Sequence, residues 1–295
     1  MKRVKINGVS HSMEQKLSTK PAARERFSWH VLRHKNESKK QPMALLNHCW
    51  NAAKSLVFPV YCPCCRQPCD GADDRFLLCN PCKISLIRYR VPSCPRCGLF
   101  FNTDSLLQKT FSDVANCPSC QQHKLWFNAT LALGPYRGEL REAVLRSKRC
   151  SEESFTLALG ALIGQQLGPL LTTQRIDFVT NTPTHWKRRW QRGVESTELL
   201  LRGIVSQVQL PIGLRILGCR RYTRKQGTLT PAERFRNVSN AFCVRKPQQV
   251  RGKHVLVVDD VMTSGSTVNE LARILQQAGA CKVTNVVLAR GQCVS

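Results

Sequence analysis

Residues 255–267 constrain the fold of this chain more than any other segment, and they read Val-Leu-Val-Val-Asp-Asp-Val-Met-Thr-Ser-Gly-Ser-Thr. The four consecutive apolar β-formers indicate a strand that is buried on both faces of a parallel sheet. We expect that strand to span 254–259 and to end at the adjacent carboxylates Asp259 and Asp260. A short turn rich in hydroxyls follows, and the spacing of apolar residues beyond it predicts a helix over 267–278. This order of elements favours an α/β fold.

The turn over 263–267 has the composition of an anion site. Backbone N–H groups at the start of a helix point toward whatever lies above it, and the helix dipole favours negative charge there. The adjacent carboxylates can accept hydrogen bonds from ribose hydroxyls or hold a hydrated Mg²⁺. A ribose 5-phosphate combines both features. The candidate residues are Asp259, Asp260, Thr263, Ser264, Gly265, Ser266 and Thr267. The alternative is a generic strand–turn–helix crossover with a solvated acidic corner.

The charge balance of the chain predicts anionic partners. Its 295 residues include 45 Lys and Arg against 19 Asp and Glu, which gives a net charge of +26. Such an excess attracts nucleic acid, anionic membrane surfaces or phosphorylated ligands. No apolar run reaches the roughly 18 residues that a membrane span needs, so we expect none. The first residues lack the apolar core of a secretion signal, and we therefore expect a cytoplasmic protein.

Residues 1–43 form a polar, basic segment with little periodicity, and we expect it to be disordered. It contains 11 Lys and Arg and 3 Asp and Glu, so its net charge is +8. A basic arm that contacts nucleic acid is one alternative. Another is that translation begins at Met43, because the residues after it resemble a short amphipathic helix that leads into the first cysteine pair.

The chain has 16 cysteines, and eight of them form four Cys-x-x-Cys units. In a chain without a secretion signal, this spacing argues for metal rather than disulfides. Two such units supply the four ligands of one tetrahedral Zn²⁺, and sites filled entirely by protein are structural. Sequential pairing predicts one zinc on Cys62, Cys65, Cys79 and Cys82 and another on Cys94, Cys97, Cys117 and Cys120. Cys64 and Cys69 leave the register of the first site open, and redox Cys-x-x-Cys pairs are the alternative chemistry.

The remainder of the chain alternates between strand and helix patterns, which predicts a parallel sheet covered by helices. The ligand site of such a sheet lies at the carboxyl ends of its strands. We expect three parts: residues 1–43, a helix with the cysteine module over 44–125, and the α/β domain over 129–291. Strands are expected over 129–136, 176–180, 254–259 and 282–289, and helices over 139–148, 154–171, 194–208 and 267–278.

Residues 255–267 closely resemble the phosphoribosyl-pyrophosphate (PRPP) loop of type I phosphoribosyltransferases, with Ser264 where threonine is usual. Preceded by a double zinc ribbon, the segment makes residues 44–291 similar to the ComF/GntX family of competence proteins. Three further stretches carry the resemblance: 136–148, 182–193, and the spaced residues Arg220, Thr223, Gln226, Leu229, Arg234 and Asn237. The resemblance implies a type I phosphoribosyltransferase-like fold that binds Mg²⁺–PRPP.

The resemblance also implies further site residues. Arg188 and Arg192 would hold the pyrophosphate, where positive charge is needed as the leaving group gains charge. Thr223, Gln226 and Arg234 would close over the ligand as a lid. Residues 183–237 contain 12 Lys and Arg and 3 Asp and Glu, a net charge of +9. A solvated basic face or a nucleic-acid groove is the alternative interpretation. Trp186 and Trp190 could stack on bases or anchor a core.

One departure from the family pattern concerns the segment after Arg192 and Gly193. The family usually has an aromatic residue and Asn-Gln there, whereas this chain has Val194, Glu195 and Ser196. Two functions therefore remain. The first is a phosphoribosyltransferase with an unidentified acceptor. The second is a non-catalytic module that binds nucleic acid, single-stranded DNA in particular, or a protein of DNA uptake. Whether the chain is an enzyme stays open.

Overall fold

The computed structural model describes residues 60–69, 78–88, 92–101, 117–121, 124–185, 194–224 and 229–291. These residues belong to one compact unit, Asn51–Ser295. Several predictions lie outside the described residues: the basic extension 1–43, and Arg188, Arg192, Gln226, Trp186 and Trp190. The boundaries of the three predicted parts stay a prediction.

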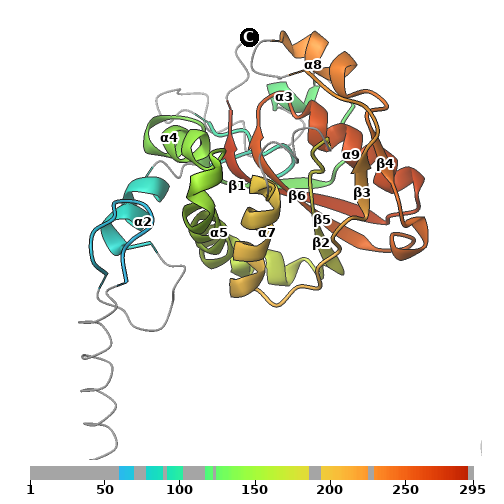
Figure 1. The fold of residues 1–295 in the computed structure, drawn as a ribbon. Helices are drawn as coiled ribbons and strands as arrows, with labels where there is room; N and C mark the ends of the chain where they lie inside the picture. Colours follow the sequence, from blue (N-terminus) through green and yellow to red (C-terminus); the bar gives the residue numbers. More distant parts are fainter. Residues whose placement is uncertain are drawn as a thin grey trace, which may run out of the picture. The chain divides into compact units, whose positions relative to one another are not determined.

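The sheet consists of four parallel strands in the order β1-β6-β5-β2 (Figure 1). Their bounds are β1 Ala129–Pro135, β2 Phe178–Asn181, β5 His254–Met262 and β6 Lys282–Arg290. Val257 on β5 aligns with Thr180 on one side and Asn285 on the other. The predicted parallel sheet is confirmed. The apolar run that begins at Val255 forms an interior strand, and its carboxyl end lies between the ends of two neighbours.

The two faces of the sheet carry different helices. Leu256 and Val258 pack in a core with α5 (Glu153–Thr173) and α7 (Ser196–Gln207), and α4 (Gly138–Arg146) joins it. Val255 and Val257 pack in a second core with α9 (Ser266–Gln277). This alternation is the two-residue period of a strand that is covered on both sides. The four predicted helices of the α/β domain are present, and each end lies within two residues of its expected position.

Close packing of α5 on α7 depends on glycine. A Cβ placed on Gly203 would lie 2.1 Å from the carbonyl oxygen of Leu157, and one placed on Gly160 would lie 2.2 Å from that of Leu200. The whole segment Cys150–Thr173 is long and apolar enough to cross a membrane, although 67% of its apolar window is buried inside the protein. No such candidate was predicted, because Gln and Gly interrupt the apolar run of α5. The burial assigns this helix to the core.

Three elements beside the sheet were not predicted. Strands β3 (Leu217–Cys219) and β4 (Phe242–Val244) pair antiparallel, and α8 (Pro231–Val238) lies between them in the chain. Two 3₁₀ turns, Cys150–Glu152 and Pro247–Gln249, complete the connections.

The cysteine module contributes α2 (Asn80–Ile87) and α3 (Pro118–Gln121) and packs into both cores. Cys62 belongs to the core on the α5 and α7 face, whereas Cys97 and Cys117 belong to the core on the α9 face. The two halves of the module therefore lie against opposite faces of one sheet.

Candidate ligand and metal sites

The acidic pair lies at the centre of the carboxyl edge of the sheet. The predicted end of the strand at Asp259 is wrong, since β5 continues to Met262, whose partner on β6 is Arg290. Asp259 is 7% exposed, and the backbone N–H of Asp260 donates to its Oδ1 at 2.9 Å. Burial, together with the neighbouring carboxylate of Asp260, raises the pKa of Asp259 to about 8. Asp259 can therefore hold or release a proton near neutral pH.

Lys148 completes this edge of the site, and the sequence did not identify it as a site residue. Its Nζ lies 3.0 Å from Oδ2 of Asp260, whose side chain is 20% exposed. Burial lowers the pKa of Lys148, but the carboxylates of Asp260 and Asp259 outweigh it, so the net shift is upward. The lysine follows α4 in a segment that belongs to the family resemblance. A half-buried ammonium group beside two carboxylates leaves the edge less negative than the acidic pair alone.

The turn after β5 is the predicted anion site. Gly265 adopts the left-handed conformation, with φ at +77°, and immediately precedes α9. A glycine has no side chain to cap the start of a helix, which leaves that role to other groups or to a ligand. The Oγ of Ser264 donates to the Oγ of Ser266 at 3.2 Å, and the Ser266 side chain is buried. Thr263, Ser264, Gly265, Ser266 and Thr267 thus form one continuous turn next to the acidic pair.

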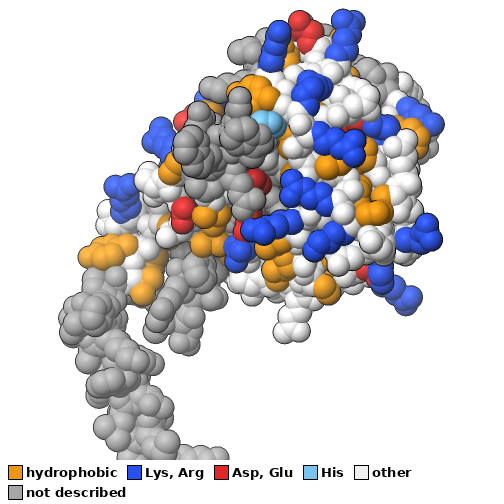
Figure 2. Space-filling model, turned by 45° about the vertical axis from the view of Figure 1, so that its right-hand side comes forward, with side chains coloured by type: hydrophobic (Ala, Val, Ile, Leu, Met, Phe, Trp, Pro, Cys, Tyr) orange, Lys and Arg blue, Asp and Glu red, His pale blue; other side chains and the backbone are white. Residues whose placement is uncertain are grey.

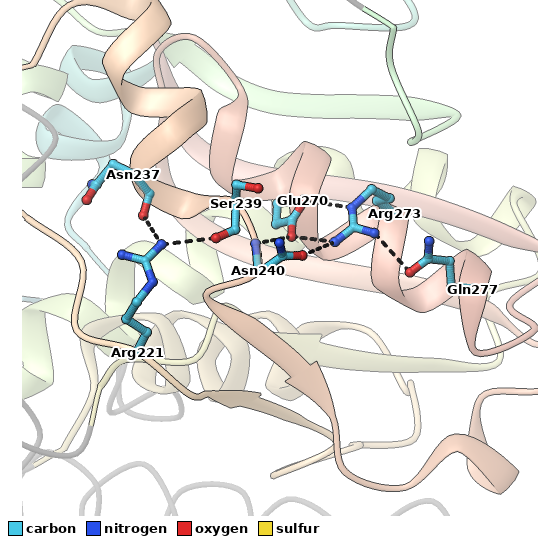
Figure 3. Close-up of polar contacts among 7 residues, drawn as sticks. All are labelled: Arg221, Asn237, Ser239, Asn240, Glu270, Arg273 and Gln277. Atoms are coloured by element: carbon cyan, nitrogen blue, oxygen red, sulfur yellow. Dashed lines mark hydrogen bonds and ion pairs between the residues drawn. The ribbon is translucent and has the colours of Figure 1, made fainter.

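The predicted lid residues that the structure describes, Thr223 and Arg234, lie between β3 and β4, with Arg234 on α8. Arg221 donates to the carbonyl oxygens of Asn237 and Ser239, both at 3.0 Å (Figure 3).

The end of the segment that carries the predicted lid residues is attached to α9. The N–H of Asn240 donates to Oε1 of Glu270 at 2.8 Å, and Arg273 pairs with the same carboxylate at 2.7 Å (Figure 3). We call Asn240, where this segment ends, the lid base. The lid base and the turn at 263–267 are therefore connected through one helix, α9.

A polar pocket of about 200 Å³ lies beside the end of β2. Glu195, the departure from the family pattern, accepts a hydrogen bond from Asn181 Nδ2 at 3.1 Å. Glu195 thus contributes to fixing the end of β2. Exposed basic residues on the same side of the molecule are Arg202, Arg215 and Arg245, all of which line the pocket.

The eight predicted metal ligands form two groups. Cys62, Cys65, Cys79 and Cys82 place their sulfurs within 4.8 Å of one another, and so do Cys94, Cys97, Cys117 and Cys120. We call them the first and the second cysteine cluster. Measured separations are 3.7 Å for Cys65 and Cys79, 3.7 Å for Cys94 and Cys120, and 3.5 Å for Cys97 and Cys117. Tetrahedral Zn²⁺ with bonds of about 2.3 Å would place its sulfurs about 3.8 Å apart. Both clusters can hold a metal ion, and Cys64 and Cys69 belong to neither.

Two arginines join these clusters to the α/β domain, and the sequence did not single them out. Arg146 donates to the carbonyl oxygens of Pro63 and Cys64, both at 2.6 Å. Arg290 donates to the carbonyl oxygen of Cys97 at 3.0 Å. No local signal marks them, because their partners are distant in the sequence.

The sequence of this chain is similar to those of known proteins. The Phosphoribosyl transferase domain family matches residues 198–293. The chain is 29% identical over 238 residues to the "DNA utilization protein YhgH" of Salmonella typhi, which covers 80% of this chain and 99% of the relative. It is 25% identical over 217 residues to "Competence protein F" of Haemophilus influenzae, which covers 72% of this chain and 90% of the relative.

A similar solved structure is the hypoxanthine-guanine phosphoribosyl transferase of L. donovani. It is 16% identical and superposes with a TM-score of 0.30 over 46% of this chain and 71% of that one.

Proposed function

This chain belongs to the ComF/GntX family of proteins with a phosphoribosyltransferase-like domain, and from that premise we propose that it binds Mg²⁺–PRPP or a related phosphoribosyl ligand. The observation that carries the proposal is the junction of β5 and α9. There the interior strand β5 carries an acidic pair and is followed by a turn with a left-handed glycine. Both lie at the carboxyl edge of a parallel sheet. Parallel α/β sheets bind ligands at that edge.

Different residues of the chain would bind different parts of the ligand. The 5-phosphate would be held by N–H and hydroxyl groups of 263–267, because a helix start favours an anion. The ribose hydroxyls would donate to Asp259 and Asp260, and Lys148 would keep the acidic pair from repelling a polyanion. By family resemblance, Arg188 and Arg192 would bind the pyrophosphate, and Thr223, Gln226 and Arg234 would close over it.

The oxygen ligands of the acidic pair are of the type that Mg²⁺ accepts. Asp259 and Asp260 would hold it, directly or through water, and the ion would supply positive charge against the pyrophosphate. In a transferase, a nucleophile would attack C1 of the ribose and pyrophosphate would leave with the bonding electrons. The acceptor is unidentified. The two cysteine clusters would hold structural Zn²⁺, and the expected location is the cytoplasm.

Isothermal titration of Mg²⁺–PRPP into zinc-loaded protein tests the proposal. We expect saturable binding that the double variant Asp259→Ala, Asp260→Ala abolishes. Glu142→Ala is the control, since it removes a carboxylate that is 68% exposed and pairs with Arg141. Wild-type protein that gives no heat of binding, or a double variant that binds as wild type, would overturn the proposal.

The second candidate is a nucleic-acid-binding module, and the basic surface favours it. Figure 2 shows Lys and Arg side chains scattered over one face, where Asp and Glu are few. The exposed basic residues include Arg202, Arg215, Arg220, Arg221, Arg224, Arg245 and Lys246. The names of the relatives refer to DNA utilization and competence. Protein of this kind would bind single-stranded DNA through phosphates, with an affinity that falls steeply with salt. An affinity that stays constant between low and moderate salt would exclude it.

A further inference from the structure

Arg290, the last residue of β6, is 1% exposed and is the largest fully buried side chain among the described residues. Its guanidinium donates to four backbone carbonyl oxygens and one hydroxyl. The carbonyls are those of Cys97 at 3.0 Å, Met262 at 3.0 Å, Gly291 at 2.6 Å and Thr263, and the hydroxyl is that of Ser119 at 3.2 Å. All three guanidinium nitrogens take part, and the three carbonyl oxygens at Nη1 share its two hydrogens.

These hydrogen-bond partners belong to two different parts of the fold. Met262 and Thr263 open the turn that is proposed to hold phosphate. Cys97 is a member of the second cysteine cluster, and Ser119 lies between its members Cys117 and Cys120. One buried guanidinium therefore connects the cluster to the turn.

The hydrogen bonds also fix how the turn faces. A trans peptide points its N–H opposite to its carbonyl. Because the carbonyls of Met262 and Thr263 face Arg290, the following N–H groups of Thr263 and Ser264 point away from it. The guanidinium thus binds the carbonyl side of the turn. The amides of the turn are left on the opposite side, where an anion would be bound.

A second set of contacts attaches the same half of the module to α9. Asn269 accepts the N–H of Trp126 at 2.7 Å and donates to the carbonyl oxygen of Lys124 at 3.0 Å. Cys94 and Cys117 share a core with Val268, in the first turn of α9. The second cluster, the helix and the turn are therefore packed as one body.

The first cluster is attached elsewhere. Arg146 binds its backbone at Pro63 and Cys64 and pairs with Glu152 at 2.8 Å. Cys62 packs on the α5 and α7 face, opposite to α9. The two clusters thus offer a matched comparison within one protein.

We propose that Arg290 is a positioning residue through which metal binding at the second cysteine cluster fixes the shape of the 263–267 turn. A metal holds four sulfurs together, and without it their loops separate. Cys97 and Ser119 would then withdraw two acceptors from a buried cation, and leaving such donors unsatisfied is costly. The guanidinium would follow the loops or seek water, and the turn would lose its support. The link concerns the chain's own structure, and only the ligand arm of the test rests on the proposed function.

Hydrogen exchange of peptides covering 261–270, together with metal content, tests the link. Cys120→Ser should lose one metal and raise exchange there about tenfold, which corresponds to ~1.4 kcal/mol of local opening. Cys65→Ser should also lose one metal, from the first cluster, and leave this exchange within about twofold of wild type. Arg290→Lys should raise the same exchange, whereas Arg146→Lys should not. Equal exchange in the two cysteine variants would overturn the proposal.

If Cys120→Ser or Arg290→Lys does not fold, Ser119→Ala replaces it, because that change removes one acceptor and leaves all eight thiols. Its exchange at 261–270 should rise about threefold at unchanged metal content, and no rise would contradict the link. PRPP titration separates the two proposals. Wild type that fails to bind PRPP overturns the function alone, since the exchange comparison still decides the link. Wild type that binds PRPP while exchange is equal in both cysteine variants overturns the link alone.

Discussion

The ammonium group of Lys148 lies 3.0 Å from Oδ2 of Asp260. The lysine comes from the segment after α4, and the aspartate from the interior strand β5. The contact brings one positive charge to a carboxylate pair that would otherwise repel phosphate. Because both side chains are partly buried, at 37% exposed for Lys148 and 20% for Asp260, the attraction is screened less than that of a fully exposed ion pair.

Lys148→Met should therefore weaken the binding of Mg²⁺–PRPP at pH 7. We expect about a tenfold loss of affinity, which is the size of one charge-assisted interaction. Lys148→Arg should retain most of the affinity. Titration calorimetry of both variants measures the difference, and an unchanged dissociation constant for Lys148→Met would show that the lysine has no part in binding.

The raised pKa of Asp259 leads to a second prediction, which concerns how stability depends on pH. Its pKa is raised to about 8 by burial and by Asp260, whereas an aspartate in the unfolded chain has a pKa of about 4. Between these values the folded state binds more protons than the unfolded state, so this group lowers stability as pH rises from about 4 to 8.

Asp259→Asn removes that titration. Relative to wild type, the variant should gain about 3 °C or more in unfolding temperature at pH 8 compared with pH 5, which is ~1 kcal/mol in a protein of this size. Thermal unfolding at matched metal content measures it. A difference between variant and wild type that is the same at both pH values would mean that the carboxyl is ionised throughout.

Much of the fold was predictable because the signals are local. The apolar run before Asp259 and the period of the helix after Gly265 identify β5 and α9 from a few adjacent residues. The end of β5 was not predictable, because pairing of Met262 with Arg290 continues the ladder beyond the acidic pair. Strands of three residues, such as β3, are too short to show alternation. The helix α8 did have a signal, since Thr230 and Glu233 form a capping box.

The candidate site was predictable only in part, because only some of its residues give a local signal. The turn and the acidic pair lie together in the sequence. Lys148, Arg146 and Arg290 reach their partners across the fold, and a lone basic residue in a chain with 45 of them gives no signal. Their roles depend on how the cysteine module packs against the sheet, which no spacing of residues encodes.

The left-handed turn at Gly265 allows a matched test. Gly265 and Gly252 have φ values of +77° and +72°, so alanine at either position should cost about 1–2 kcal/mol in backbone strain. A Cβ on Gly265 would also lie 2.7 Å from Cε of Met262, whereas one on Gly252 meets nothing within 4 Å. Gly265→Ala should weaken PRPP binding more than about tenfold, because strain at this φ would displace the amides that are proposed to bind the 5-phosphate.

Gly252→Ala should lose similar stability and keep wild-type affinity. Denaturant unfolding and titration of both variants separate strain from function. Equal loss of affinity in the two would show that the effect comes from general destabilisation, and full affinity in Gly265→Ala would show that the turn does not bind the ligand.

The last prediction concerns the attachment of the lid base to α9. Glu270 accepts the N–H of Asn240 at 2.8 Å and pairs with Arg273 at 2.7 Å (Figure 3). Asn240 has a positive φ of 55°, a conformation that needs support from its surroundings. Glu270→Ala removes that support and leaves Arg273 without its carboxylate. We expect trypsin to cleave within 220–240 about tenfold faster in this variant, because local opening limits such cleavage.

Glu142→Ala is the control for Glu270→Ala. It removes the carboxylate that pairs with Arg141 at 2.7 Å on α4, a pair whose side chains are 68% and 51% exposed. Exposed pairs of this kind contribute little, so its cleavage within 220–240 should match wild type. If the two variants are cleaved equally fast, the lid base is held by its own chain and not by α9. If only Glu270→Ala is faster, the helix that follows the phosphate turn also controls the segment that is proposed to close over the ligand.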